Sequence, residues 1–334
     1  MKVFYSSEYV GSAYAFETTR KAKWVADSLA RVPIPGIVLV EPPLLTWEQL
    51  VAVHDPAYVR AVQTGIPRHL AESQGFDWDP GLWPMVLSSN GGVVAAALEA
   101  LQTGLAGSLS SGLHHARRGS GAGFCTFNGL VIAAREALAA GAESILILDL
   151  DAHCGGGTAS LIAGDPRIRQ VDVAVNSFDV YSSSAAGDPG GRHVRLRVVQ
   201  DGDRYLSEIE KELEEIEREG PRFDLCLYNA GMDPFEGCST GGMKGISHDT
   251  LAARERLVCA WCRDRIPAVA FVLAGGYIGW GLDAGGLVAL HRLTLAAAAG
   301  AISVPGSGSP TDRPPGAAAG RARDAETRGS DGES

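Results

Sequence analysis

Basic residues are in the minority in this sequence of 334 residues, which contains 29 lysines and arginines against 39 aspartates and glutamates. The formal net charge of −10 does not favour binding to nucleic acid or to an anionic membrane surface. We therefore expect no nucleic-acid partner, whereas a cationic substrate would be attracted modestly.

Long apolar runs are also missing. The most apolar helical stretch, which starts at Leu295, is too short and too rich in alanine to cross a bilayer, and the N-terminus has no apolar core of a signal peptide. The six cysteines are scattered, and the CxxC of Cys259 and Cys262 has no second pair to complete a zinc site. These features predict a cytoplasmic protein with reduced thiols and no membrane span.

Glycine and apolar residues are abundant, as expected for many short loops between buried elements. Strand-like apolar runs, among them 145–149, 171–181 and 268–273, alternate with helical periodicity, as at 91–104 and 203–219, while 65–84 looks irregular. This alternation predicts an α/β domain with a doubly wound, mostly parallel sheet over residues 1–303. The polar, Pro- and Gly-rich segment 304–334 is predicted to be a disordered tail.

The stretch 145–158, ILILDLDAHCGGGT, joins a buried strand to potential metal ligands. Asp151 and His153 are two residues apart and would point to the same side of a continuing strand. Taken alone, the pair could equally be a helix cap and a buried histidine. Asp233, which follows another apolar strand, would complete a set of two carboxylates and one imidazole, typical of a catalytic zinc site that could also accept Fe(II), Mn or Co.

Further reactive groups follow other strands. His114 and His115 lie in a glycine-rich loop with Gly123 and Phe124, where one imidazole could accept a proton while a buried carboxylate such as Asp149 holds the other in a different protonation state. Tyr277 follows Gly275 and Gly276 and could donate a hydrogen bond to a developing oxyanion. By themselves, a pair of histidines in a loop and a lone tyrosine are more often structural.

Four segments, SGLHHARRGSGAGFCTFNG, LDLDAHCGGG, LYNAGMDPFEG and LAGGY, resemble in this order the zinc-dependent histone deacetylase family. The phrases DLDAH and YNAG are most similar to its class IV branch and the bacterial relatives of that branch. The resemblance extends over about residues 1–300 and implies the three-layer α/β/α arginase/deacetylase fold. It also implies zinc held by Asp151, His153 and Asp233, and a structural potassium ion bound by the backbone nearby.

The same resemblance implies a role for each remaining residue. His115 would be the main proton shuttle, His114 would be supported by Asp149, and Tyr277 would polarise the carbonyl. Substrate-binding residues implied by the resemblance are Gly123, Phe124, Gly275 and Gly276, with Asp77 or Asp79 as the aspartate at the rim. The expected substrate is acyl-lysine in a protein or peptide.

Two positions depart from the family pattern. Cys154 replaces the usual His or Gln, and Gly156 replaces an Asp or Asn that orients the second histidine, so that His115 is expected to lack its usual partner. In many relatives an aromatic residue faces Phe124 across the tunnel, and this chain has only Tyr181 as a weak candidate for it. Without that aromatic residue the tunnel would be wider and would accept longer acyl chains.

The leading hypothesis is therefore a metal-dependent amidohydrolase that removes acyl groups from lysine. An acidic loop containing Glu72, Asp77 and Asp79 supports an alternative, a small-molecule deacetylase acting on acetylpolyamines or another acylated small amine. Gly156 supports a second alternative, a metal-bound ligand-binding or sensing homologue with little turnover. A binuclear manganese enzyme is less favoured because HCGGG supplies no further ligand.

Overall fold

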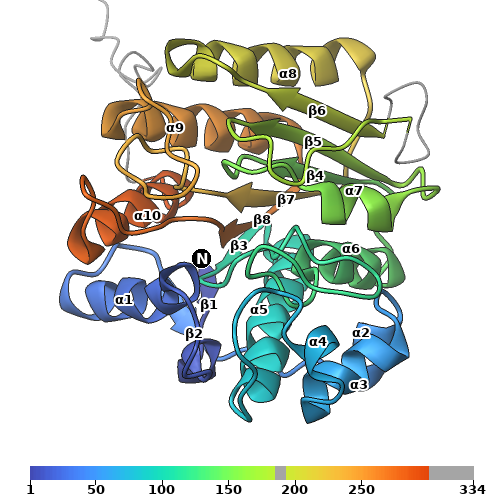
Figure 1. Ribbon diagram of the computed structural model, residues 1–334. Coiled ribbons are helices and arrows are strands. Elements are labelled where there is room, and N and C mark those ends of the chain that lie inside the picture. Colours follow the sequence, from blue (N-terminus) through green and yellow to red (C-terminus); the bar gives the residue numbers. More distant parts are fainter. Residues whose placement is uncertain (185–192, 301–334) are drawn as a thin grey trace, which may run out of the picture. The chain divides into compact units, whose positions relative to one another are not determined.

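A single sheet of eight parallel strands forms the centre of the protein (Figure 1). The structure is a computed structural model that describes residues 1–184 and 193–300. The strand order is β2-β1-β3-β8-β7-β4-β5-β6. The strands are β1 (Lys2–Phe4), β2 (Val38–Val40), β3 (Leu105–Ser108), β4 (Ile145–Asp149), β5 (Ile168–Ala174), β6 (Val194–Val198), β7 (Leu225–Ala230) and β8 (Ala268–Leu273). The predicted doubly wound parallel sheet is confirmed, while the predicted tail at 304–334 lies outside the described residues.

Helices cover both faces of the sheet and make the three predicted layers (Figure 1). They are α1 (Glu17–Arg31), α2 (Trp47–Val51), α3 (Pro56–Thr64), α4 (Arg68–Ala71), α5 (Leu82–Thr103), α6 (Gly129–Ala139), α7 (Gly156–Ile162), α8 (Tyr205–Glu219), α9 (His248–Arg265) and α10 (Ala284–Ala298). Because side chains alternate along a strand, Leu146 and Leu148 of β4 pack with α1, α8, α9 and α10. Ile145 and Ile147 pack on the other face with α2, α3, α5, α6 and α7.

Local signals explain where several helices start and stop. Thr46 and Gln49 form a reciprocal capping box at the start of α2. Asp55 caps α3, Pro56 occupies its first turn, and Gly65 ends it with a φ of 76°.

Two boundaries and one additional strand differ from the sequence expectation. Helix α5 begins at Leu82 and not at Gly91, because burial of its apolar face outweighs the low helix propensity of the Asn90-Gly91-Gly92 segment. Strand β5 ends at Ala174, so that residues up to 181 form a turn and not a strand. Strand β6 was not predicted; it lies at the edge of the sheet, where Arg195 pairs with Glu212 of α8.

Helix α5 is also long and apolar enough to satisfy the length and hydropathy of a membrane span. However, 72% of its most apolar window is buried inside the protein. It packs against α6 and the sheet, the environment of a core helix.

Candidate active site

The predicted reactive residues follow the ends of four strands, β3, β8, β7 and β4, which are neighbours in the middle of the sheet. Parallel strands end at the same edge of a sheet, and ligands bind outside their carboxyl ends. The residues that follow these strands are His114 and His115 after β3, Asp151 and His153 after β4, Asp233 after β7, and Tyr277 after β8. The topology therefore brings together groups that are far apart in the sequence.

Asp151, His153 and Asp233 form one buried cluster. Nδ1 of His153 lies 3.1 Å from Oδ1 of Asp151 and 3.1 Å from Oδ2 of Asp233. Gly275 closes the cluster from β8, because its N–H donates to Oδ2 of Asp151 at 2.8 Å. A Cβ atom at Gly275 would lie 2.1 Å from Oδ2 of Asp233, so only glycine fits there.

The chemistry of this cluster fits a divalent cation. The ligand atoms all lie within 4.8 Å of one another, and a single imidazole nitrogen cannot donate well to two carboxylates at once. Oδ2 of Asp233 is buried without a hydrogen bond. Burial and the charge of Asp151 raise the pKa of Asp233 to about 6. A cation held by Asp151, His153 and Asp233 would satisfy the orphaned oxygen and balance both carboxylates.

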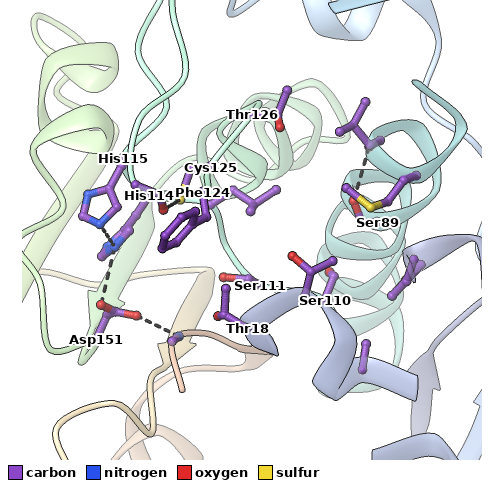
Figure 2. A pocket seen from close by; sticks show the side chains of 18 of the residues that line it. Thr18, Ser89, Ser110, Ser111, His114, His115, Phe124, Cys125, Thr126 and Asp151 are labelled. Carbon is purple, nitrogen blue, oxygen red and sulfur yellow. Dashed lines mark hydrogen bonds and ion pairs between the residues drawn. The ribbon is translucent and has the colours of Figure 1, made fainter. Parts of the chain in front are cut away.

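His114 is held between two carboxylates. Its Nδ1 lies 2.7 Å from Oδ2 of Asp149. Its Nε2 lies 3.6 Å from Oδ1 of Asp151 and 3.1 Å from Nε2 of His115 (Figure 2). Burial opposes the charged form, but Asp149 and Asp151 raise the pKa of His114 to about 10. Asn229 donates to Oδ1 of Asp149 at 2.8 Å and fixes that carboxylate. The arrangement matches the predicted support of His114 by Asp149.

His115 does have a carboxylate partner. Its Nδ1 lies 3.0 Å from Oδ2 of Asp179, a residue in the turn after β5 that the sequence analysis did not identify. Burial and the neighbouring His114 lower the pKa of His115 to about 4, although Asp179 opposes this shift. Gly156 supplies no carboxylate, so His115 lacks its usual partner, and Asp179 supplies one from another segment. The signal that could have found Asp179 is an acidic residue just beyond the strand adjacent to β4.

Gly123 and Phe124 lie beside the tandem histidines on the pocket wall. Both have left-handed backbone conformations, with φ values of 50° and 64°, and a Cβ atom at Gly123 would lie 2.4 Å from the ring of His115. The unusual conformation of Phe124 is held by its N–H, which donates to the carbonyl of Gln74 at 2.7 Å. The Phe124 ring stacks on Phe16 with centroids 4.0 Å apart, a contact that the sequence analysis missed.

The ring of Phe178, which precedes Asp179, contacts two of the imidazoles. It packs edge-on against His115 at 4.9 Å and His153 at 6.0 Å between centroids. Tyr181, the candidate for the aromatic opposite Phe124, instead lies half-buried with its hydroxyl 3.4 Å from the carbonyl oxygen of Arg195. Tyr181 is thus directed toward β6 because the chain has already turned at Asp179.

Tyr277 is buried at the pocket beside the metal-ligand cluster. Its ring lies 6.4 Å from the ring of His153 and 6.2 Å from that of Phe124, between centroids. Burial, followed by the charges of Asp233 and Asp151, raises the pKa of Tyr277 well above its usual value. Gly276, predicted to bind substrate, packs against Leu287 and His291 of α10 and does not line this pocket.

The two aspartates predicted at the rim have different environments. Asp79 is engaged within the protein, since Oδ2 accepts from the Ser12 hydroxyl at 2.5 Å and Oδ1 accepts from the N–H of Gly81 at 2.6 Å. Asp77 is exposed, and neither residue lines the pocket. Glu72 is paired with Arg68 at 3.0 Å. These contacts favour a structural role for Asp79 and leave Asp77 as an exposed carboxylate of the loop.

Hydrogen bonds of His54 and Asn128 hold the loop that carries His114 and His115. Nε2 of His54 accepts from the N–H of Asn128 at 3.0 Å, so its Nδ1 carries the proton and donates to the carbonyl of Arg117 at 2.8 Å. The Asn128 amide donates to the carbonyl of His114 at 3.2 Å. These bonds fix the backbone of the loop that carries the two imidazoles.

Comparison with known proteins agrees with this geometry. A family model, the histone deacetylase domain, matches residues 15–287. An uncharacterised protein of Picosynechococcus is 35% identical over 69% of this chain and 75% of its own length. Histone deacetylase 2 of Arabidopsis thaliana is 30% identical over 56% of this chain and 48% of its own length, so the match spans about half of that protein.

Among solved structures, acetylpolyamine aminohydrolase from Burkholderia pseudomallei superposes with a TM-score of 0.72 at 19% identity, covering 89% of this chain and 98% of that one. The fold and the site together define an amidohydrolase of the arginase/deacetylase fold. The family match covers most of the chain. This chain belongs to the histone deacetylase domain family.

Proposed function

We propose that this protein hydrolyses the amide bond of Nε-acyl-lysine with a zinc ion held by Asp151, His153 and Asp233. The observation that carries the proposal is one pocket lined by Asp151 of this ligand cluster, by the tandem histidines and by the Tyr277 phenol. When bound, zinc would lower the pKa of a water to about 7 and would polarise an amide carbonyl. Iron(II) is the alternative ion, and potassium nearby remains a prediction from the resemblance.

The side chains supply the proton transfers. Since Nδ1–H of His115 donates to Asp179, its Nε2 carries the lone pair and takes the proton of the attacking water. The water oxygen forms the new bond to the acyl carbon, and the Tyr277 hydroxyl donates to the carbonyl oxygen as negative charge develops there. His115 then returns the proton to the nitrogen as the C–N bond breaks, which gives a carboxylate and a free lysine amine.

Aromatic rings near the catalytic groups favour an acyl-lysine over a polycationic amine. Phe16 and Phe178 are 40% and 49% exposed, and Phe124 lies between Phe16 and the catalytic groups. Apolar rings of this kind contact an acyl chain and the methylene groups of lysine. A site for polyamines would gain from free carboxylates, but Glu72 and Asp79 are already paired within the protein.

The small-amine alternative keeps one supporting observation, the exposed Asp77 in the acidic loop. We expect acetylputrescine and acetylspermidine to be turned over more slowly than acylated peptides. The sensing alternative depended on an unsupported His115, and the contact with Asp179 removes that ground.

A substrate panel tests the proposal. Protein loaded with zinc, and in parallel with iron(II), is incubated with acetyl-, octanoyl- and myristoyl-lysine peptides and with the two acetylpolyamines, and amine release is measured by mass spectrometry. Tyr277→Phe, with its metal content measured, is the inactive control. Faster turnover of a peptide than of either polyamine supports the proposal. No release from any peptide by protein with confirmed bound metal, or faster release from a polyamine, would overturn it.

A further inference from the structure

We infer that Asp179 is the positioning residue of the proton relay, and that it replaces the carboxylate for which the chain has only Gly156. The inference rests on the proposed function, because the relay matters only if His115 moves protons. Oδ2 of Asp179 accepts from Nδ1–H of His115 at 3.0 Å, and the two side chains are 8% and 5% exposed. A buried, charge-assisted bond of this kind fixes both the ring orientation and the tautomer.

The backbone after β5 carries Asp179 to the histidine. The carbonyl of Phe178 accepts from the N–H of Cys154 at 3.0 Å, which ties this segment to the chain leaving β4. Oδ1 of Asn176 accepts from the N–H of Phe178 at 2.8 Å and closes the turn. Asp179 then adopts a left-handed φ of 59°, a conformation that Asp tolerates better than most residues. Its side chain is thereby directed inward and not along the strand.

The carboxylate has two further donors that hold it in place. The backbone N–H of Gly157, in the first turn of α7, donates to Oδ2 at 3.0 Å. The guanidinium of Arg117 contacts Oδ1 and also donates to the carbonyl of Gly156 at 3.2 Å. Arg117 is 43% exposed and lies two residues beyond His115, so the histidine loop and the Asp179 turn are clamped to each other.

Two substitutions at Asp179 separate positioning from general structure. In Asp179→Asn, the amide oxygen can still accept from His115 and Gly157, while the NH₂ group turns toward Arg117, which can move into solvent. In Asp179→Ala, the acceptor is lost. We expect Asp179→Ala to lower kcat by about 10- to 100-fold with KM and zinc content little changed, and Asp179→Asn to recover a substantial part of that loss. Asp165→Ala, which removes a loop aspartate paired with Arg135 and Arg167, is the matched control and should keep wild-type kcat.

A double-mutant cycle asks whether Asp179 acts through His115. We expect His115→Ala and His115→Ala/Asp179→Ala to have the same residual rate, because the carboxylate has no ring left to orient. If Asp179→Ala lowers the rate as much without the histidine as with it, the inference is overturned. It is also overturned if Asp179→Ala alone keeps wild-type kcat.

A readout without turnover separates this inference from the proposed function. In protein with ¹⁵N-labelled histidine, the Nδ1–H proton of His115, assigned by its loss in His115→Ala, should give a hydrogen-bonded resonance in wild type and Asp179→Asn and lose it in Asp179→Ala. If the wild type hydrolyses no substrate of the panel, the proposed function fails and this resonance alone decides the positioning. A resonance that is unchanged in Asp179→Ala overturns the inference.

Discussion

A Cβ atom on Gly156 would lie 2.4 Å from the carbonyl oxygen of Asp179 and 2.7 Å from its Oδ1. Real Cβ atoms essentially never come this close to another heavy atom, so a side chain at Gly156 and the present position of Asp179 exclude each other. Gly156, which departs from the family pattern, thus leaves open the space that the carboxylate of Asp179 occupies.

Substitution of Gly156 should therefore damage the relay and not repair it. We predict that Gly156→Ala and Gly156→Asp each lower kcat by about 10-fold or more, because Asp179 is displaced from His115. Gly119→Ala, where a Cβ atom meets nothing within 4 Å, should leave the rate unchanged. Steady-state kinetics of the three variants decide the matter, and increased activity of Gly156→Asp would show that the carboxylate works better at the family position.

The sheet and the cluster of Asp151, His153 and Asp233 were predictable because they depend on short-range patterns. An apolar run that ends in Asp149, Asp151 and His153 is buried wherever it is placed in a parallel sheet, and its polar end must then lie at the carboxyl edge. The order of the four central strands brings Asp233 to the same point. No knowledge of loop conformation was needed for these residues.

Asp179 and Phe16 could not be predicted because their positions depend on loops. Residues 171–181 read as one strand, but contacts of the folded chain, such as the bond between Cys154 and Phe178, make it turn after Ala174. Phe16 lies just before α1, and only the folded chain brings it against Phe124. Such contacts are set by tertiary packing, for which the local sequence carries no periodic signal.

Removal of the Tyr277 hydroxyl should slow the chemical step. We predict that Tyr277→Phe lowers kcat by about 10²- to 10³-fold, the usual cost of one lost oxyanion donor. The ring contacts with Phe124 and His153 are retained, so KM and metal content should change little. Tyr14→Phe removes an exposed hydroxyl and is the control. A Tyr277→Phe protein with wild-type kcat would exclude the proposed role of the phenol.

Metal binding should stabilise the folded protein through the buried carboxylates. At an ion concentration about 100 times its Kd, we expect a gain of about 2.7 kcal/mol in the free energy of unfolding, which appears as a rise in Tm when zinc is added to chelator-treated protein. Asp233→Asn should abolish this rise, whereas Asp165→Asn, outside the cluster, should retain it. The difference in Tm with and without zinc, measured for each variant by calorimetry, is the relevant quantity. An equal rise in Asp233→Asn would argue against the assigned ligand set.

Substitution of the two loop aspartates, Asp77 and Asp79, should change the stability of the protein to different extents. We predict that Asp79→Ala lowers the free energy of unfolding by about 1–3 kcal/mol, because the hydroxyl of Ser12 and the N–H of Gly81 lose a charged acceptor. Asp77→Ala should leave stability unchanged, since its side chain is exposed. Denaturant titration compares the two variants. A larger loss for Asp77→Ala would contradict the assigned roles.

The stacked pair of Phe16 and Phe124 should select for long acyl chains. The rings are 4.0 Å apart at an angle of 23°, and Phe16 is 40% exposed beside the pocket. Loss of the outer ring removes apolar contact and an aromatic pair that contributes about 0.5–1.5 kcal/mol, which corresponds to roughly a 2- to 12-fold change in affinity. We therefore predict that Phe16→Ala raises KM for octanoyl- and myristoyl-lysine peptides within this range and changes KM for acetyl-lysine less, because a short acyl group stays near Tyr277. Phe16→Tyr keeps the stacked ring and should behave as wild type. An equal rise in KM for all three chain lengths would instead place Phe16 in contact with the peptide and not with the acyl chain.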